Sequence, residues 1–407
     1  MTEIFLTIFF ISVLLFFLGS GIWVALSMIG VSSIGMMLFT SRPVGDAMAT
    51  TIWGTSSSWT LTALPLFVWM GEILFRTKLS ENLFKGLSPW MQKLPGGLIH
   101  VNVVGCALFA AISGSSAATV ATVGKMSIPE LRKRNYPEKI LLGSLAGSGT
   151  LGLLIPPSII LIIYGVAVQE SIAKLFIAGI IPGIMIALIF MSYVIIWSLI
   201  NKKEMPKILE EYSLLEKVRR SKQLLPVIFL ILAVIGSIYT GVATATEAAS
   251  LGVVGALILS YFQRSLTLDT FKSSLLGATK TSCMIAFILA GSTFLSLAMG
   301  FTGLPRNLAI WIQSMDLSPY VLIFVLMIFY IILGMFLDGI SAVVLTMAVI
   351  EPMIRQAGFD MIWFGIFLVI VVEMAQITPP VGFNLFVLQG MAKKDMGFIA
   401  RSAFPLF

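Results

Sequence analysis

The chain has 407 residues, of which 58% are hydrophobic and only 11% are charged, and its mean hydropathy is +1.01. Soluble domains carry about 25% charged residues, so this composition excludes a soluble protein. Long apolar runs without polar/apolar alternation also exclude a membrane β-barrel. A helical protein that crosses the bilayer many times remains. The 26 basic residues outnumber the 19 acidic ones, and we interpret this excess as membrane topology, not as a surface for nucleic acid.

Hydrophobic segments recur along the whole chain, and the basic residues gather between them. The first segment begins near residue 4 without the basic flank of a cleaved signal peptide, so we expect it to stay in the protein. Of the 26 basic residues, 22 fall in five polar gaps, and placing those gaps in the cytoplasm puts the N-terminus outside. Residues 98–135 then enter and leave from the cytoplasmic side, and residues 320–355 from the outer side. Both are predicted to be re-entrant helical hairpins.

Three polar stretches complete the predicted organisation. Residues 78–93 and 303–316 are too short and too polar to span, so we expect arm helices that lie along the membrane surface. Residues 201–223 form the only long charged stretch. We interpret it as a cytoplasmic linker helix between two halves, 1–200 and 224–407.

The two halves share a proline pattern. Adding 223 to the residue number takes the pair Pro156–Pro157 to Pro379–Pro380, and Pro129 to Pro352. The charge pattern assigns the matching segments to opposite sides of the membrane. An inverted-topology repeat requires that relationship, so we predict one.

An interrupted hydrophobic segment follows each hairpin, at residues 140–166 and 362–391. The interruptions read GSGTLGLLIPPS and EMAQITPPVGFN, in which glycines permit unwinding and prolines remove donors. We expect the prolines in the first turn of a new half-helix. Each discontinuous helix should then present bare carbonyls, which attract a cation, and bare N–H groups, which attract an anion.

The hairpin turns carry polar groups at the predicted middle of the membrane. The first turn is SGSSAAT, in which Ser115 and Ser116 are candidate caps for the second helix. In the second turn, LDGIS, Asp338 occupies the position of Ser115. A carboxylate in a membrane is costly without a partner, so we favour a cation ligand over a simple helix cap. We expect no Lys or Arg at this depth. The candidate anion-binding hydroxyls are those of Ser113, Ser116, Thr119 and Thr150.

These features predict coupled transport of an anionic solute with Na⁺ or H⁺, and three alternatives stay open. A stand-alone carboxylate symporter would use the same sites. An ion channel also contains re-entrant loops, although it needs no broken helices after them. An intramembrane serine protease would need a histidine, and the only one is His100, at the mouth of the first hairpin.

Four stretches resemble the large membrane subunit of TRAP (tripartite ATP-independent periplasmic) transporters: FAAISGSSAATVATVG, AGSGTLGLLIPPSIILIIYGVA, YTGVATATEAASLGVVGA and ITPPVGFNLFV. The resemblance covers nearly the whole chain. It implies a non-enzymatic, elevator-type secondary transporter of the bacterial inner membrane, coupled to Na⁺. It also implies a small four-helix membrane subunit, and a periplasmic binding protein that delivers organic acids such as C4-dicarboxylates. A further helix beyond residue 407 is implied as well.

In this family the Na⁺ sites lie at the hairpin turns and broken helices, which implies two sites in this chain. The first would comprise Gly114, Ser115, Gly149 and Pro156. The second would comprise Asp338, Gly339, Thr378 and Pro379. The organic acid would bind between them, on the hydroxyl groups named above and on Ser341.

Overall fold

The structure is a computed structural model that describes residues 2–77, 79–206, 212–222, 224–303 and 318–407, together with residues 305, 307 and 310. Every regular element in those ranges is a helix. Four of these helices are long and apolar enough to cross a membrane, or seven if each bent pair counts as one span. The prediction of an all-helical chain with interrupted apolar segments is confirmed for this part of the chain.

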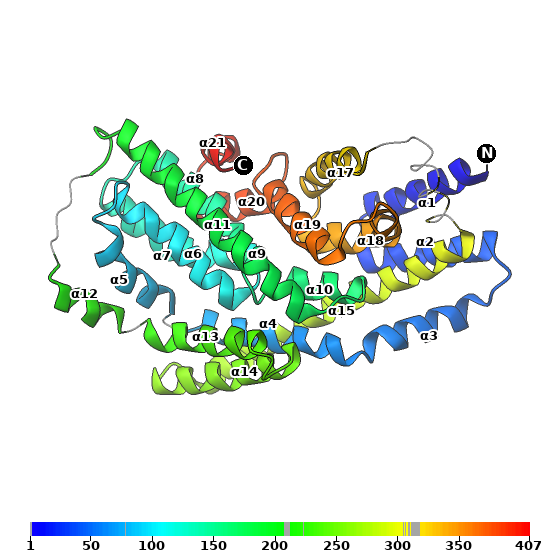
Figure 1. Ribbon diagram of the computed structural model, residues 1–407, viewed down its shortest axis with the longest axis horizontal. Helices are drawn as coiled ribbons and strands as arrows, with labels where there is room; N and C mark the ends of the chain where they lie inside the picture. Colours follow the sequence, from blue (N-terminus) through cyan, green and yellow to red (C-terminus); the bar gives the residue numbers. More distant parts are fainter. Residues whose placement is uncertain are drawn as a thin grey trace.

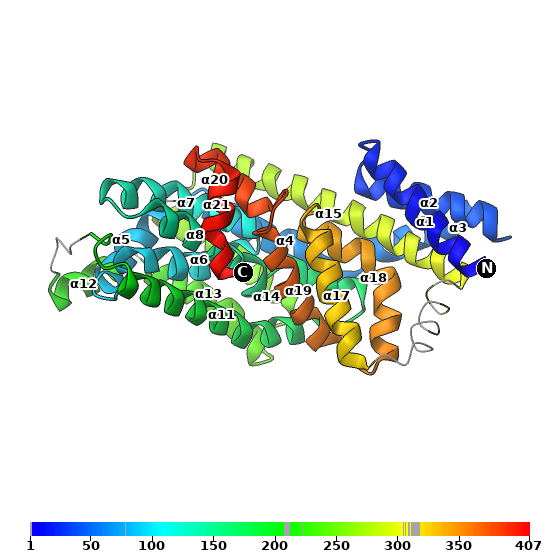
Figure 2. The same ribbon diagram turned by 90° about the horizontal axis from the view of Figure 1, so that it is seen from above.

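The chain begins with α1 (Thr2–Gly19), α2 (Val24–Phe39) and α3 (Val44–Ser56). These three helices gather at one end of the long axis (Figures 1 and 2). The 3₁₀ turn η1 (Trp59–Thr62) joins α3 to α4 (Ala63–Phe75), and the helix axis bends by 54° there.

The first hairpin follows a short helix. Helix α5 (Leu79–Met91) lies where the first arm helix was predicted. The 3₁₀ turn η2 (Gly97–Ile99) leads into α6 (His100–Ser113), and α7 (Ser116–Lys133) returns beside it. The predicted hairpin boundaries, 98 and 135, therefore lie within two residues of the observed ones.

The first interrupted helix consists of α8 (Glu138–Gly149), α9 (Leu151–Leu154) and α10 (Ile159–Ala167). Its axis bends by 41° at the break. The longest uninterrupted apolar run, α11 (Ile172–Ile200), comes next and packs along α8, α9 and α10.

The linker is less helical than predicted. Residues 201–206 form turns, residues 207–211 and 223 lie outside the described part, and α12 (Leu214–Ser221) is the helical portion. Pro206 cannot continue a helix and restricts the residue before it. Ser213 starts a new helix through a reciprocal capping box with Glu216. Both views place α12 beside α5, at the end of the molecule opposite α1 (Figures 1 and 2).

The second half begins with α13 (Leu225–Tyr239), α14 (Ala245–Phe262) and the 35-residue α15 (Leu268–Thr302). Most of the second predicted arm helix, 303–316, lies outside the described residues.

The second hairpin and the second interrupted helix follow in the same order as in the first half. Their elements are α17 (Pro319–Gly334), α18 (Gly339–Gln356), α19 (Met361–Gln376) and α20 (Phe383–Ala392). The chain then forms α21 (Met396–Ala403) and the 3₁₀ turn η3 (Phe404–Leu406).

The helices fall into two packing groups. Helix α15 packs against α2, α3 and α4, and α14 packs against α4 and α13; we call α2–α4 and α13–α15 the scaffold. Helices α6–α10 and α17–α20 pack mainly on one another, and we call them the hairpin body. The body touches the scaffold mainly where α6 meets α4 and where α18 meets α15, and also where α10 meets α4.

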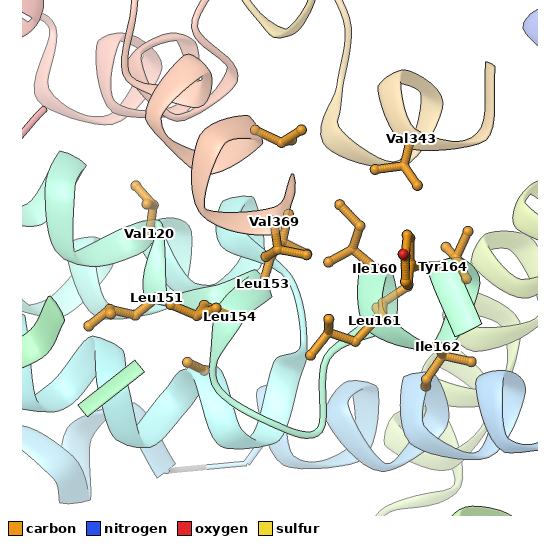
Figure 3. Packing of buried hydrophobic residues seen from close by; sticks show 14 of the residues in the cluster. Val120, Leu151, Leu153, Leu154, Ile160, Leu161, Ile162, Tyr164, Val343 and Val369 are labelled. Carbon is orange, nitrogen blue, oxygen red and sulfur yellow. The ribbon is translucent and has the colours of Figure 1, made fainter. Parts of the chain in front are cut away.

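The interior of the hairpin body is a close-packed aliphatic core that joins the two halves of the chain. Leu153 of α9 lies beside Val369 of α19, and Val343 of α18 points toward Tyr164 of α10 (Figure 3). Tyr164 and Val343 have no exposed surface, and the Tyr164 hydroxyl donates to the Met361 carbonyl at 2.6 Å. Because interiors of this density transmit displacement instead of absorbing it, we expect the body to move as a unit.

Candidate binding cavity

The first hairpin turns at Gly114, which ends α6 with φ of +58°. A Cβ atom at this position would lie 2.8 Å from the Pro157 carbonyl oxygen, so the close approach also requires glycine. Ser115 then begins α7, and its side chain accepts from the Ala118 amide at 3.4 Å. The Ile159 amide donates to the Gly114 carbonyl at 3.3 Å. The turn and the first break are therefore in direct contact.

The first break spans residues 155–158 and is almost completely buried. Ser158 is the N-cap of α10, and its hydroxyl also donates to the Leu153 carbonyl at the end of α9. The proline pair precedes this cap and so does not occupy the first turn of the new half-helix as predicted. The Ser158 hydroxyl therefore hydrogen-bonds to the end of α9 on one side of the break and to the start of α10 on the other.

The second hairpin turn repeats these contacts. Asp338 is the N-cap of α18, and its Oδ2 accepts from the Ser341 amide at 3.1 Å. The Val381 amide donates to the Met335 carbonyl at 3.2 Å, which joins this turn to the second break. The other Asp338 carboxylate oxygen has no hydrogen bond within the described part of the chain, and the residue lines a cavity.

The second break differs from the first in its exposure. Pro379 and Pro380 are exposed, whereas Pro156 and Pro157 are buried. Thr378 Oγ1 donates to the Met374 carbonyl at 2.9 Å. Helix α20 starts at a glycine without a side-chain cap, so its first N–H groups have no side-chain acceptor.

A cavity of about 1230 Å³ lies between the two hairpin turns and the scaffold. Its walls come from α6, α7, α9, α10, α18 and α20 on the body side, and from the scaffold helices α2, α4 and α15. Five of the predicted site residues line it: Ser113, Gly114, Ser115, Asp338 and Ser341. Both predicted hairpin turns therefore line the same cavity.

The other predicted site residues do not line this cavity: Ser116, Thr119, Gly149, Thr150, Pro156, Gly339, Thr378 and Pro379. Thr119 Oγ1 lies 2.8 Å from Ser113 Oγ, and this hydrogen bond links the two ends of the turn. Thr150 donates to the Gly147 carbonyl at 2.6 Å. Ser116 does not cap α7; its hydroxyl lies 3.0 Å from the Gly149 carbonyl. His100 is buried away from the turn and bonds to the Pro95 carbonyl at 2.8 Å.

A basic residue on the scaffold side of the cavity was missed. Lys280 of α15 is the only basic residue among the described lining, and the sequence reasoning did not place it at this cavity. The charge count had placed it at the edge of a cytoplasmic gap, but α15 begins twelve residues earlier at Leu268. Glu72 also lines the cavity and pairs with Arg76 at 2.8 Å.

Glu373 was missed as well. It is 4% exposed, in the last turn of the apolar helix α19, and its carboxyl lies 3.2 Å from the Ser116 hydroxyl of the first hairpin. A carboxylate inside an apolar run is a signal for a functional group. Its partner, however, comes from the other half of the chain, which the sequence does not reveal.

The chain is similar over most of its length to one protein family. The model for "Tripartite ATP-independent periplasmic transporter, DctM component" matches residues 9–407. The C4-dicarboxylate TRAP transporter large permease protein DctM of Pseudomonas aeruginosa is 34% identical over 93% of this chain and 88% of its own length. The 2,3-diketo-L-gulonate TRAP transporter large permease protein YiaN of Escherichia coli is 32% identical over 88% of this chain and 84% of its own.

Two further likenesses concern assembly and fold. The isethionate TRAP transporter permease protein DctMQ of Oleidesulfovibrio alaskensis is 30% identical over 90% of this chain, which covers 57% of that longer protein. The crystal structure of the Alcanivorax borkumensis YdaH transporter, described as having an unusual topology, superposes with a TM-score of 0.61. It covers 94% of this chain and 93% of that one at 12% identity, so the likeness concerns the fold alone.

Proposed function

This chain belongs to the DctM family of large permease subunits of TRAP transporters, and on that premise we propose that it couples Na⁺ entry to the uptake of an organic acid. The family members it matches are transport proteins and not enzymes. C4-dicarboxylates are the first candidate class of solute, because they are what the named DctM relatives carry.

One observation carries the proposal: the cavity holds groups for both a cation and an anion. Asp338 and the backbone of the first turn supply oxygen atoms on the body side, and Lys280 supplies a positive charge on the scaffold side. Hard oxygen donors suit Na⁺, and an ammonium group suits a carboxylate. The Na⁺ sites would lie at the two turns, and the solute would lie between them on Ser113 and Ser341.

The two packing groups suit an elevator mechanism, in which the hairpin body slides along a fixed scaffold. Basic residues concentrate at the end that carries α5 and α12, which is the cytoplasmic end by the positive-inside rule. In that orientation Glu72 lies in the last turn of α4 at its cytoplasmic end, and Lys280 lies in the cytoplasmic half of α15. The cavity would therefore open inward, so this conformation is the one that releases the solute.

Two partners and a membrane complete the proposed system. The DctMQ relative joins large and small membrane components in one chain, and we infer that a separate small four-helix subunit binds the scaffold here. A periplasmic binding protein would deliver the solute to the outer face. Long apolar side chains cover the exposed faces of α11, α13 and α14, as expected for contact with lipid in the bacterial inner membrane.

Reconstitution tests this proposal. The permease, its small subunit and its binding protein are placed in liposomes, and uptake of radiolabelled succinate, 2,3-diketo-L-gulonate and isethionate is measured with and without an inward Na⁺ gradient. We expect one of these acids to enter only when Na⁺ and the binding protein are both present. Uptake of every acid at the same rate in K⁺ would contradict Na⁺ coupling.

Cys283 provides a native probe of the cavity. It is exposed, it lines the cavity, and it lies three residues after Lys280 on the same face of α15. A charged thiol reagent that cannot cross membranes should label it from the cytoplasmic side. The transported acid with Na⁺ should slow labelling several-fold, because the solute would cover this face of the helix.

The control for this labelling is built into the chain. Cys106 has no exposed surface, so the Cys283→Ser variant should remain at background labelling. Labelling that occurs only from the periplasmic side would refute the inward-open assignment. Labelling that the solute does not slow would place the solute elsewhere.

A further inference from the structure

A buried polar cluster lies inside the hairpin body and not at the cavity. Its members are the Ser116 hydroxyl of α7, the Gly149 carbonyl that ends α8, the Glu373 carboxyl of α19 and the Asn384 amide of α20. The three side chains are at most 4% exposed, and none of the four residues lines the cavity. The cluster therefore joins the first hairpin and first broken helix to the second broken helix.

The Ser116 oxygen is the centre of this cluster. It lies 3.0 Å from the Gly149 carbonyl oxygen, 3.2 Å from Glu373 Oε2 and 2.6 Å from Asn384 Nδ2. A serine hydroxyl has one proton to donate and two lone pairs that accept. Asn384 Nδ2 donates to Ser116, and Asn384 Oδ1 lies 3.0 Å from the same oxygen, so the Gly149 carbonyl, the Glu373 carboxyl and the Asn384 amide oxygen compete for the single serine proton. If Glu373 were ionised, the serine proton could satisfy only one of these buried acceptors.

In the described part of the chain, no other hydrogen-bond donor and no basic residue would compensate a negative charge on Glu373. Its Oε1 atom has no hydrogen-bond partner. The helices that pack most closely on α19 are α9, α10, α11, α17, α18 and α20. Their only basic residues are Lys174 and Arg355, and both are exposed. An ionised carboxylate without donors or a counter-ion is strongly unfavourable in such surroundings.

We propose that Glu373 is a proton-binding site: its carboxyl group is held as a neutral acid and donates its proton to Ser116 Oγ. Ser116 then donates to the Gly149 carbonyl and accepts from both Glu373 and Asn384. This arrangement fills its one donor position and its two acceptor positions, with no net charge in the core. Glu373 is thus a positioning residue that fixes the residue next to Ser115 in the first turn.

The proton is retained during transport and is not exchanged. All four groups belong to the hairpin body, so a movement of that body along the scaffold does not open the cluster. Only this step rests on the proposed elevator function. The protonation itself rests on the hydrogen-bond geometry, so it is tested independently of transport.

Infrared spectroscopy of the purified permease in a detergent without ester groups tests the protonation. A neutral carboxyl group has a carbonyl stretch that an ionised carboxylate lacks. The wild-type spectrum should contain such a band, and the Glu373→Gln spectrum should lose it. Glu72→Gln is the control and should keep the band, because Glu72 is paired with Arg76. A wild-type band that Glu373→Gln does not reduce would overturn the proposal.

Measurements of uptake distinguish a Glu373 that keeps its proton from a Glu373 that binds the coupling ion. Glutamine offers an N–H where the neutral acid offers an O–H, so Glu373→Gln should keep Na⁺-driven uptake within about threefold of wild type. Glu373→Leu has a similar volume but no donor, and should lower uptake at least about tenfold. A folded Glu373→Gln protein that loses Na⁺ dependence would show instead that Glu373 is an ionised cation ligand. Absence of Na⁺-driven uptake in the wild type would refute the transport function and leave the infrared result standing.

Discussion

Asp338→Asn should reduce Na⁺-driven uptake by roughly a hundredfold, which corresponds to about 3 kcal/mol of lost cation binding, because it removes the carboxylate on the body side of the cavity. The Oδ2 atom of Asp338 caps α18 through the Ser341 amide. Asparagine caps a helix as well as aspartate does, so the fold should be preserved while the negative charge is lost. Uptake at several Na⁺ concentrations, with thermal stability in parallel, measures both effects.

Asp360→Asn is the matched control for Asp338. Asp360 is the N-cap of α19 and accepts from the Trp363 amide at 2.9 Å. It is exposed and does not line the cavity. Its substitution changes the same charge and the same type of cap, so uptake should stay near the wild-type value. If the Asp338→Asn protein kept its Na⁺ dependence, Asp338 would be only a helix cap, and the proposed second Na⁺ site would be wrong.

Gly152→Ala should lower uptake by more than about tenfold, because the hairpin turn would be displaced by the added methyl group. A Cβ atom at Gly152 would lie 2.6 Å from the Ser115 carbonyl oxygen and 2.7 Å from Ser116 Cα. Both are backbone atoms, so rotation of a side chain cannot relieve the overlap. The uptake rate and the melting temperature of the purified permease measure the effect.

Gly236→Ala controls for the general effect of alanine in a helix. Gly236 lies within α13, and a Cβ atom there would have no neighbour within 4 Å. Alanine favours a helix over glycine by about 1 kcal/mol, so this variant should be as stable as the wild type or slightly more so. Equal behaviour of Gly152→Ala and Gly236→Ala would mean that contact between the first turn and the first break does not matter for transport.

The interruptions of the helices could be predicted from the sequence because they have a local chemical cause. Glycine, serine and proline stop a helix wherever they cluster, regardless of what lies nearby. The observed ends of both hairpins and both interrupted helices accordingly lie within two residues of the predicted ones. Capping was predictable in part for the same reason: Ser115 and Asp338 are N-caps, as their positions beside helix starts suggested.

The partners of each side chain could not be predicted, because they depend on which helix faces which. Ser116 and Ser115 are adjacent and chemically alike, yet Ser115 lines the cavity and Ser116 points into the core toward Glu373. The helical rotation of about 100° per residue separates their directions. The Ser116 hydroxyl contacts side chains more than 250 residues away, those of Glu373 and Asn384.

The charge count was misleading for Lys280 for a related reason. Counting basic residues assigns a residue to one side of the membrane but not to a depth or a face. Helix α15 is 35 residues long, so Lys280 lies well inside the helix and reaches the cavity. The sequence did not show where α15 begins within the polar gap. Because the helix begins at Leu268, Lys280 lies inside it.

The steady-state accumulation ratio of the transported acid tests the central claim most directly. Proteoliposomes that contain the permease, its small subunit and the binding protein are given equal solute inside and outside, with Na⁺ only outside. A Na⁺-coupled transporter predicts that the internal solute rises above the external concentration and falls back when the Na⁺ gradient is dissipated. Internal solute that never exceeds the external concentration would contradict coupled transport and indicate a passive pathway.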